Sequence, residues 1–301
     1  MRYLVTGASG FIGSNLTLEL AKNHEVVGLC RIAPGDKENL RGFNGKFVEG
    51  DIRTYDFHFL GKFDAIFHQA AITDTTVLDP LLMFSTNVTA FEKILNYALE
   101  TGCKKVVYAS SAATYGKGKI PMRESSSPTP ANIYGESKVK MEEVAKEFSS
   151  HHPKISLVGL RYFNVYGPRE FHKGHAASMI YQLYSQIVAG KAPRIFKWGD
   201  QFRDFIYVKD VVLANIKSSE HSGSGVFNVG TGIGTTFNQV IETINRALGT
   251  HKPTDYFDNP YSFYQDQTQA DMTHSNSGLK FKCQFTPEQG ILDYVQYLQK
   301  K

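Results

Sequence analysis

Cysteine is scarce in this chain of 301 residues, which contains only three. Cys30, Cys103 and Cys283 are odd in number and too far apart in sequence for a metal cluster or a disulfide framework. His172 and His175 lack the partners and the spacing that a zinc site needs. We therefore expect no metal site, and a reducing, cytoplasmic environment.

Long apolar runs are also missing. No stretch approaches the roughly 18 apolar residues of a membrane span, and the N-terminus lacks the regions of a signal peptide. The net charge is only +4, and the basic residues are scattered along the chain. The tyrosine-rich stretch 256–269 has no interleaved basic residues, so it is not typical of a stacking surface for nucleic acid. We expect neither membrane nor nucleic-acid partners.

Hydrophobic residues make up 42% of the chain and charged residues 21%, as in folded globular proteins. Short apolar runs alternate with segments of helical period, which predicts βαβ units and a parallel sheet. We expect strands at 2–6, 25–30, 46–49, 65–68, 105–110, 155–161 and 226–229. We expect helices at 11–22, 81–99, 134–149 and 208–218.

At 33.7 kDa the chain is long enough for one large α/β unit or for two lobes. The alternation loosens after residue 161, where longer loops intervene. We predict an α/β fold with a Rossmann-like, doubly wound parallel sheet and a smaller C-terminal lobe. The larger domain would occupy residues 1–165 with a returning segment near 205–232, and residues 166–301 would form mainly the smaller lobe.

A glycine-rich loop follows the first predicted strand, where residues 6–13 read TGASGFIG. Glycine allows a tight turn and a close approach of the backbone to a phosphate, whose charge meets free N–H groups at the start of the next helix. An ordinary glycine turn is the simpler alternative, but the preceding strand and the following helix favour a dinucleotide site. We assign to cofactor binding Gly7, Ser9, Gly10, Phe11, Ile12 and Gly13.

Arg31 directly follows the second predicted strand, where NAD-binding sites usually carry an acidic residue for the ribose hydroxyls. An arginine at that place can pair with the 2′-phosphate of NADP. The alternative is a solvated loop residue. We therefore expect the larger domain to bind NADP, with NAD as the other possibility.

Further candidates lie at the ends of the third and fourth predicted strands, where open α/β sheets bind ligands. The Asp51 carboxylate suits an adenine amino group, and Ile52 suits contact with the adenine ring. The small residues in 69–71 allow the backbone to pass close to a cofactor. Each of these has a structural explanation as well. We add to the cofactor site Asp51, Ile52, Gln69, Ala70, Ala71 and Asn87.

Tyr134 and Lys138 are four residues apart and so share one face of a predicted helix. Such a pair is common by chance, but Ser111 stands in a turn after the fifth predicted strand of the same chain. A nearby ammonium and a positive nicotinamide would stabilise the Tyr134 phenolate. Tyr134 would then exchange a proton with a hydroxyl while hydride moves, and Ser111 would orient the reacting oxygen.

These features together resemble the extended short-chain dehydrogenase/reductase family of nucleotide-sugar enzymes. The resemblance extends over nearly the whole chain, through 161–169 (RYFNVYGPR), 203–208 (RDFIYV) and 227–232 (FNVGTG). It implies a nucleotide-sugar substrate, catalytic roles for Ser111 and Tyr134, and contact of Lys138 with Tyr134 and the cofactor ribose. We also expect a homo-oligomer.

Within that family, residues 167–174 (GPREFHKG) and 268–271 (TQAD) resemble the branch that inverts C6″ of an ADP-activated heptose. The resemblance implies NADP-dependent conversion of ADP-D-glycero-D-manno-heptose to its L-glycero epimer. Inverting a carbinol carbon removes hydride from one face and returns it to the other. The resemblance gives Tyr134 one face and Lys173 the other. A loop lysine attracted to a substrate phosphate is the alternative for Lys173.

The resemblance also implies substrate contacts in the smaller lobe. Asn164 would face the sugar near the nicotinamide, and the planar fork of Arg203 would hold the diphosphate. Tyr264 is preceded by Phe263 where relatives often have arginine, and His175 replaces a small residue, so the nucleotide base and the sugar pocket stay open. We assign to substrate binding Ser111, Asn164, His175, Arg203 and Tyr264.

Other activities share part of this pattern. An epimerase acting at C4 of a UDP- or GDP-hexose would use the same glycine loop, Ser111, Tyr134 and Lys138, and Lys173 separates the two. A 4,6-dehydratase is disfavoured because Ala112 follows Ser111 where that branch has an acidic pair. A cofactor-binding sensor without catalysis is disfavoured because it would commonly lack the tyrosine or the lysine.

Overall fold

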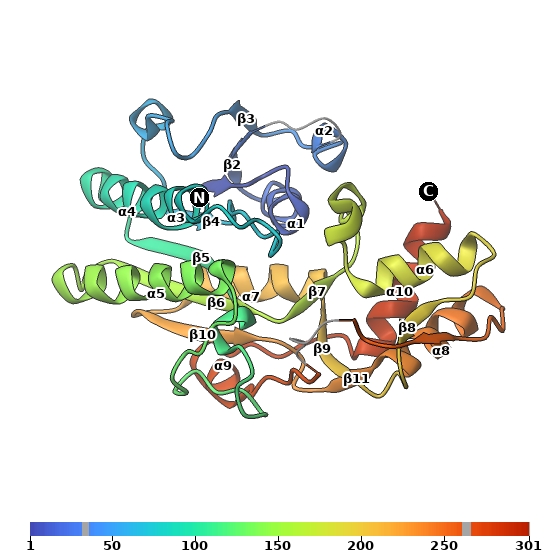
Figure 1. The fold of residues 1–301 in the computed structure, drawn as a ribbon. Coiled ribbons are helices and arrows are strands. Elements are labelled where there is room, and N and C mark those ends of the chain that lie inside the picture. The colour runs from blue at the N-terminus through green and yellow to red at the C-terminus, as the bar shows by residue number, and fades with distance from the viewer. Residues whose placement is uncertain (32–35, 261–265, 301) are drawn as a thin grey trace.

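Seven parallel strands form the main sheet, in the order β10-β6-β5-β4-β1-β2-β3 (Figure 1). This computed structural model describes residues 1–31, 36–260 and 266–300. The strands are β1 (Arg2–Thr6), β2 (Glu25–Cys30), β3 (Lys46–Glu49), β4 (Ala65–His68), β5 (Lys105–Ser111), β6 (Ser156–Tyr162) and β10 (Gly225–Val229). The predicted α/β, Rossmann-like fold is confirmed.

Successive strand residues point to opposite faces of the sheet. Both faces are apolar here, and helices cover both. Tyr3 and Val5 of β1 belong to an apolar core with α1 (Phe11–Leu20) and α7 (Val208–Glu220). Leu4, between them, belongs to a second core with α4 (Ala90–Thr101) and α5 (Ile133–His151). Shorter helical segments are η1 (Phe57–Leu60), α2 (Asp36–Asn39), α3 (Pro80–Phe84), η2 (Ser85–Thr89) and η3 (Ala112–Tyr115).

The chain leaves the main sheet after β6 and builds a smaller lobe before and after it returns for β10. A three-stranded sheet of order β11-β9-β7 and a two-stranded sheet of β12 and β8 lie there. The strands are β7 (Asn164–Tyr166), β8 (Arg194–Phe196), β9 (Phe202–Tyr207), β11 (Gly234–Thr236) and β12 (Asp255–Phe257). The helical segments are η4 (Phe171–Ala176), α6 (Met179–Val188), α8 (Phe237–Leu248), α9 (Thr273–Gly278) and α10 (Pro287–Gln299). A third apolar core joins α6, α8 and α10 to β9.

One predicted helix differs in kind from the structure. The segment 81–99 is not one regular helix: α3, the π-helical segment η2 and α4 follow one another. A π turn inserts one extra residue into the helical ladder, so residues after it no longer continue the same face. Asn87 lies inside this turn and is completely buried.

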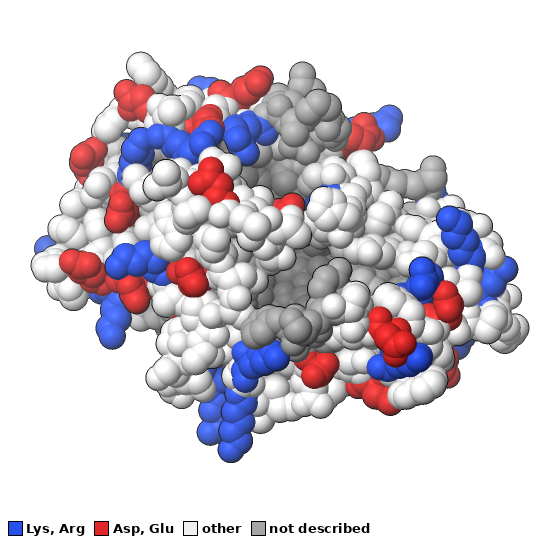
Figure 2. Space-filling model, viewed as in Figure 1, with Lys and Arg blue, Asp and Glu red and all other residues white. Residues whose placement is uncertain are grey.

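Three absences are clear within 1–31, 36–260 and 266–300. No helix there is both long and apolar enough to cross a bilayer. No three His, Cys, Asp or Glu side chains there are grouped as metal ligands, and all three cysteines are free of disulfides. On the face shown in Figure 2, Lys and Arg side chains are interspersed with Asp and Glu.

Candidate active site

The glycine loop between β1 and α1 is closed too tightly for side chains at two of its positions. A Cβ on Gly13 would lie 2.0 Å from the Gly7 carbonyl oxygen, and one on Gly7, whose φ is +69°, would lie 2.7 Å from the Ala70 nitrogen. Gly10 is the N-cap residue of α1, and no side chain there accepts a hydrogen bond from the first N–H groups of the helix. The first N–H groups of a helix have no partner within it, so this end of α1 suits a phosphate.

The other predicted residues of this loop lie partly behind it. Ser9 is fully buried, and Ile12 packs between the first and third apolar cores. Phe11 is buried in the third core, which belongs mostly to the smaller lobe. The start of α1 is therefore held by both parts of the molecule.

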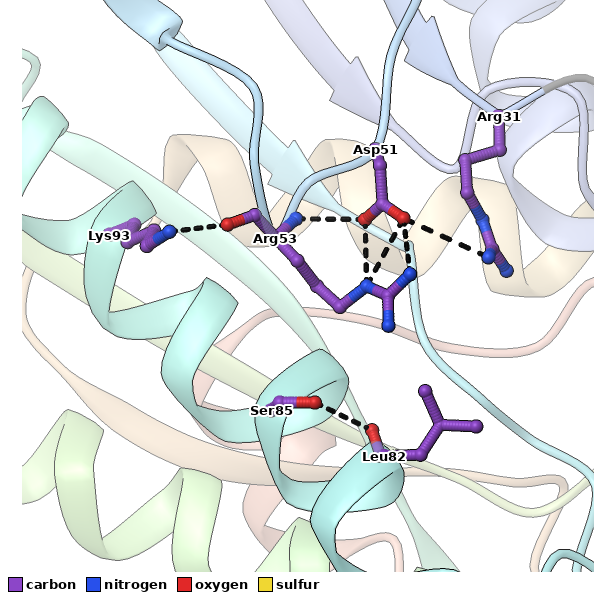
Figure 3. A network of polar contacts seen from close by, with 6 residues as sticks. All are labelled: Arg31, Asp51, Arg53, Leu82, Ser85 and Lys93. Atoms are coloured by element: carbon purple, nitrogen blue, oxygen red, sulfur yellow. Dashed lines mark hydrogen bonds and ion pairs between the residues drawn. The ribbon is translucent and has the colours of Figure 1, made fainter.

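Arg31 and Asp51 lie side by side after the ends of β2 and β3 (Figure 3). An Arg31 guanidinium nitrogen is 3.8 Å from Asp51 Oδ2. Arg53 donates to both Asp51 oxygens, with Nη2 2.6 Å from Oδ2. The hydrogen bond from Arg53 is the main reason that the pKa of Asp51 is lowered. The next residue, Ile52, is buried in the second apolar core.

The chain after β4 is held from both sides by hydrogen bonds. Gln69 donates to Asn215 Oδ1 at 2.9 Å and accepts from the Tyr162 hydroxyl at 3.0 Å. Ala70 and Ala71 are half-buried. Asn87, from η2, contacts the main chain just beyond them. Gln69 and Asn87 thus fix the path of residues 69–72, and their amides are engaged with protein groups.

Ser111, Tyr134 and Lys138 meet at the end of β5 and the start of α5. Ser111 Oγ accepts from the Ala113 N–H at 3.1 Å, and the Ser111 side chain also hydrogen-bonds Tyr134, which lowers the Tyr134 pKa. Burial has the larger effect and raises that pKa overall. The Lys138 ammonium lies 5.9 Å from the centre of the Tyr134 ring. Burial therefore dominates the pKa of Tyr134 in this structure.

Lys138 is almost completely buried, and its ammonium donates to the Ala109 carbonyl at 2.7 Å. Burial lowers the pKa of Lys138 to about 8, and the Glu142 carboxylate opposes that shift. His68, buried at the end of β4, contacts Thr6 Oγ1 through Nδ1 at 2.7 Å. Burial, with a smaller effect of Lys138, lowers the His68 pKa to about 3, so this imidazole is neutral.

Lys173 stands on η4, and the fold brings it to the glycine loop. Its Nζ lies 5.8 Å from the centre of the Phe11 ring. Burial lowers the pKa of Lys173, and the carboxylates of Glu170 and Asp74 oppose this. Glu170 is itself fully buried and fixes the loop by accepting from the Gly167 and Ser178 N–H groups at 3.1 and 2.6 Å.

His175 lies at the surface, with Nε2 3.6 Å from Asp74 Oδ2. This contact joins η4 to the loop that follows β4. The His175 side chain is otherwise mostly exposed.

Two of the predicted substrate residues lie on paired strands of the smaller lobe, Asn164 on β7 and Arg203 on β9. Asn164 donates to the Asp204 carbonyl at 3.2 Å and to Thr268 Oγ1 at 3.0 Å. The Arg203 guanidinium lies 5.8 Å from the centre of the Phe237 ring and donates to the Phe202 carbonyl at 3.0 Å. Tyr264 and Phe263 lie outside the described residues. Asn164 therefore connects β7 to the TQAD segment.

Residues absent from the prediction hold these segments together. Asp204 and Glu170 are buried carboxylates that bind backbone N–H groups, and Asn39 joins two loops. Asp204 lies in the 203–208 motif and Glu170 in the 167–174 motif, so the sequence could have indicated both carboxylates. Asn39 carries no such signal, because its partners are distant in sequence.

Comparison with known proteins agrees with this geometry. Residues 3–230 match the NAD dependent epimerase/dehydratase family. The chain belongs to that family. Among solved structures of epimerases, ADP-L-glycero-D-manno-heptose-6-epimerase from Helicobacter pylori is 38% identical, with a TM-score of 0.92 over 100% of this chain and 96% of its own.

Two other epimerases are similar in structure at lower identity. UDP-N-acetylglucosamine 4-epimerase from Methanobrevibacter ruminantium, in complex with UDP-N-acetylmuramic acid, is 31% identical, with a TM-score of 0.93 over 99% of this chain and 98% of its own. UDP-glucose 4-epimerase from Thermotoga maritima, with UDP-glucose, is 30% identical, with a TM-score of 0.92 over 100% and 99%. The epimerase fold therefore covers the whole chain, and shape alone does not separate a C6″ from a C4 epimerase.

Proposed function

We propose that this protein is a nucleotide-sugar epimerase that inverts C6″ of an ADP-activated heptose, using tightly bound NADP. The observation that carries the proposal is the place of Lys173, whose Nζ lies 5.8 Å from the ring of Phe11, the first residue of the helix after the glycine loop. The lysine that we propose as the second acid–base group, in addition to Tyr134, thus lies beside the glycine loop. The higher identity to the heptose epimerase supports the same choice.

Tyr134 acts on one face of the reacting carbon. When bound, a nicotinamide cofactor accepts hydride from that carbon and returns it. Tyr134 takes the hydroxyl proton as the carbon is oxidised, and the hydrogen bond from Ser111 favours its ionised form. Lys138 holds its ammonium near the Tyr134 ring through the Ala109 carbonyl and binds the cofactor ribose.

Lys173 serves the other face. Burial lowers its pKa, which brings its proton exchange closer to neutral pH. Buried Glu170 keeps its loop in place, and Asn164, Arg203, His175 and Tyr264 bind the nucleotide sugar. The carbonyl of the oxidised sugar then receives hydride from the opposite face, and Lys173 supplies the proton.

Arg31 gives the site its preference for NADP. Its exposed guanidinium, 3.8 Å from Asp51, stands where the second strand ends. Asp51 is neutralised by Arg31 and Arg53, so a 2′-phosphate meets no net negative charge there. Because the cofactor is regenerated in each turnover, the protein releases only the sugar nucleotide. A cytoplasmic homo-oligomer is also part of this proposal.

The second candidate is a 4-epimerase of a UDP-hexose. It is favoured by the TM-scores of the two 4-epimerases, which equal or exceed that of the heptose epimerase. In that case Tyr134 alone carries the acid–base chemistry, and Lys173 binds a substrate phosphate.

The deciding experiment incubates the purified protein with ADP-D-glycero-D-manno-heptose and resolves the two C6″ epimers, with UDP-glucose in parallel. We expect interconversion of the heptoses. Tyr134→Phe and Lys173→Met should each lower kcat by about 10²- to 10⁴-fold, and Lys191→Met, which changes an exposed lysine, should not. Activity on UDP-glucose alone, with a native kcat and a raised KM in Lys173→Met, would establish the second candidate.

A further inference from the structure

A single buried amide connects the glycine loop to the loop that carries Lys173. Asn39, at the end of α2, is 1% exposed. Its Nδ2 lies 3.0 Å from the Ser9 carbonyl oxygen and 3.2 Å from the Arg169 carbonyl oxygen. The same nitrogen lies 2.9 Å from Nδ1 of His172. Three segments that are remote in sequence therefore meet at one side-chain atom.

The chemistry of these partners fixes which way the amide faces. The two carbonyl oxygens of Ser9 and Arg169 can only accept, so the group between them has to donate. The reverse orientation of Asn39 would place Oδ1 against two carbonyl oxygens. A carboxylate at this position would repel both, so aspartate cannot replace asparagine here.

The backbone beside this contact adopts a conformation that has to be held. Arg169 has φ +74°, in the left-handed region that residues other than glycine rarely adopt. Such residues persist where their surroundings fix them. The Arg169 carbonyl contacts both Asn39 and Nδ1 of His172, the latter at 2.9 Å, and its guanidinium donates to Asn15 Oδ1 at 3.0 Å.

The held segment leads directly to Lys173. The Lys173 backbone N–H donates to the Glu170 carbonyl at 2.9 Å. His172, the residue before Lys173, lies against Asn39. A shift of Arg169 and His172 would therefore move the Lys173 ammonium away from the Phe11 ring and the start of α1. A displacement of a reacting group by about 1 Å can lower the reaction rate about 100-fold.

We propose that Asn39 is a positioning residue for Lys173, which it keeps in register with the glycine loop by donating to the Ser9 and Arg169 carbonyls, with His172 in contact beside it. This rests on the proposed function, because it needs the acid–base role of Lys173. Asn39 touches the back of the glycine loop and acts only through the loops that it connects.

The test is a double-mutant cycle with Asn39→Ala and Lys173→Met, measured as kcat and KM for ADP-D-glycero-D-manno-heptose. We expect Asn39→Ala to lower kcat about 10- to 100-fold with KM and NADP affinity changed less than about threefold. In the Lys173→Met background the same change should lower kcat less than about threefold. Asn44→Ala, an exposed asparagine between α2 and β3, serves as the matched control and should leave kcat unchanged.

The opposing outcomes are distinct. Equal losses in both backgrounds, or a loss of NADP affinity with native kcat, would show that Asn39 does not act through Lys173. If Asn39→Ala does not fold, His172→Ala removes the contact from its half-buried end and must show the same coupling. Native kcat in Lys173→Met alone would overturn the proposed function itself, and the role of Asn39 with it.

Discussion

The side-chain amide of Asn87 binds the main chain of Ile72 in both directions. Oδ1 accepts from the Ile72 N–H at 2.8 Å, and Nδ2 donates to the Ile72 carbonyl at 3.1 Å. The same Nδ2 donates to Ser137 Oγ at 3.0 Å, next to Lys138 on α5. The buried amide of Asn87, in the π turn of η2, thus joins the loop after β4 to α5, the helix that carries Tyr134 and Lys138.

Replacing Asn87 by alanine should loosen residues 69–72. We expect the free energy of unfolding in urea to fall by about 1–3 kcal/mol, because the Ile72 N–H and carbonyl lose their partners. NADP affinity, measured by titration, should fall about tenfold, since the backbone beside Ala70 forms one wall of the glycine loop. Ser85→Ala, in the same segment, is the control and should change neither. Unchanged NADP affinity in Asn87→Ala would contradict a role for this loop in the cofactor site.

Asp204 should tolerate no amide in its place. Its buried carboxylate accepts from the N–H groups of Thr231, Gly232 and Ala270 at 2.7, 2.9 and 3.0 Å. In Asp204→Asn an NH₂ group would face at least one of these donors. We expect a loss of about 2–5 kcal/mol in urea unfolding and a higher KM for the sugar nucleotide. The exposed carboxylate of Glu143, changed to glutamine, should lose less than about 0.5 kcal/mol.

Arg31→Ala should remove the preference for NADP. We expect its dissociation constant for NADP to rise about 10- to 100-fold, because a charge-assisted hydrogen bond to the 2′-phosphate is lost. The dissociation constant for NAD should change less than about threefold. Isothermal titration measures both, with Arg41→Ala as an exposed-arginine control. Equal affinities of the native protein for NADP and NAD would disprove the assignment.

The buried Lys138 should make the stability of the cofactor-free protein depend on pH. Its pKa is about 8 in the folded protein, against 10.5 for an unperturbed lysine side chain. Between these values the unfolded chain holds the proton that the folded chain lacks, so stability rises with pH in this window. Below pH 8 the folded protein bears the full cost of the charge, about 3 kcal/mol at 1.36 kcal/mol per pKa unit.

Lys138→Met isolates this effect in urea titrations at several pH values. The native protein should gain stability relative to the variant as the pH rises from about 8 to about 10. A constant difference over that range would show that Lys138 keeps its ordinary pKa when buried.

Much of the fold could be predicted because parallel strands buried on both faces are short apolar runs between helical segments. The predicted strand 155–161 differs from β6 by one residue at each end. The π turn at Asn87 could not be seen, because the apolar period continues on either side of it. The smaller lobe, with strands of three residues such as β7, β8 and β11, offers too little periodicity to read.

The site was predictable where its residues stand in local motifs. Tyr134 and Lys138 share one helix face, and the glycine loop follows a strand, so short-range rules apply to both. The contact of Asn39 with Arg169 joins residues separated by 130 positions, and no local pattern encodes it. The raised pKa of Tyr134 likewise depends on its burial in the folded chain.

The place of β10 has a consequence for the newly made chain. Strand β6 pairs with β5 on one side and with residues 225–229 on the other. As the ribosome releases the chain, the outer edge of β6 stays open until residues 163–229 have been synthesised. A fragment that ends at residue 165 would keep the unpaired edge of β6 and tend to self-associate through it. We therefore expect residues 1–165 to express as a monomer only when strand β10 is grafted onto them or supplied as a peptide.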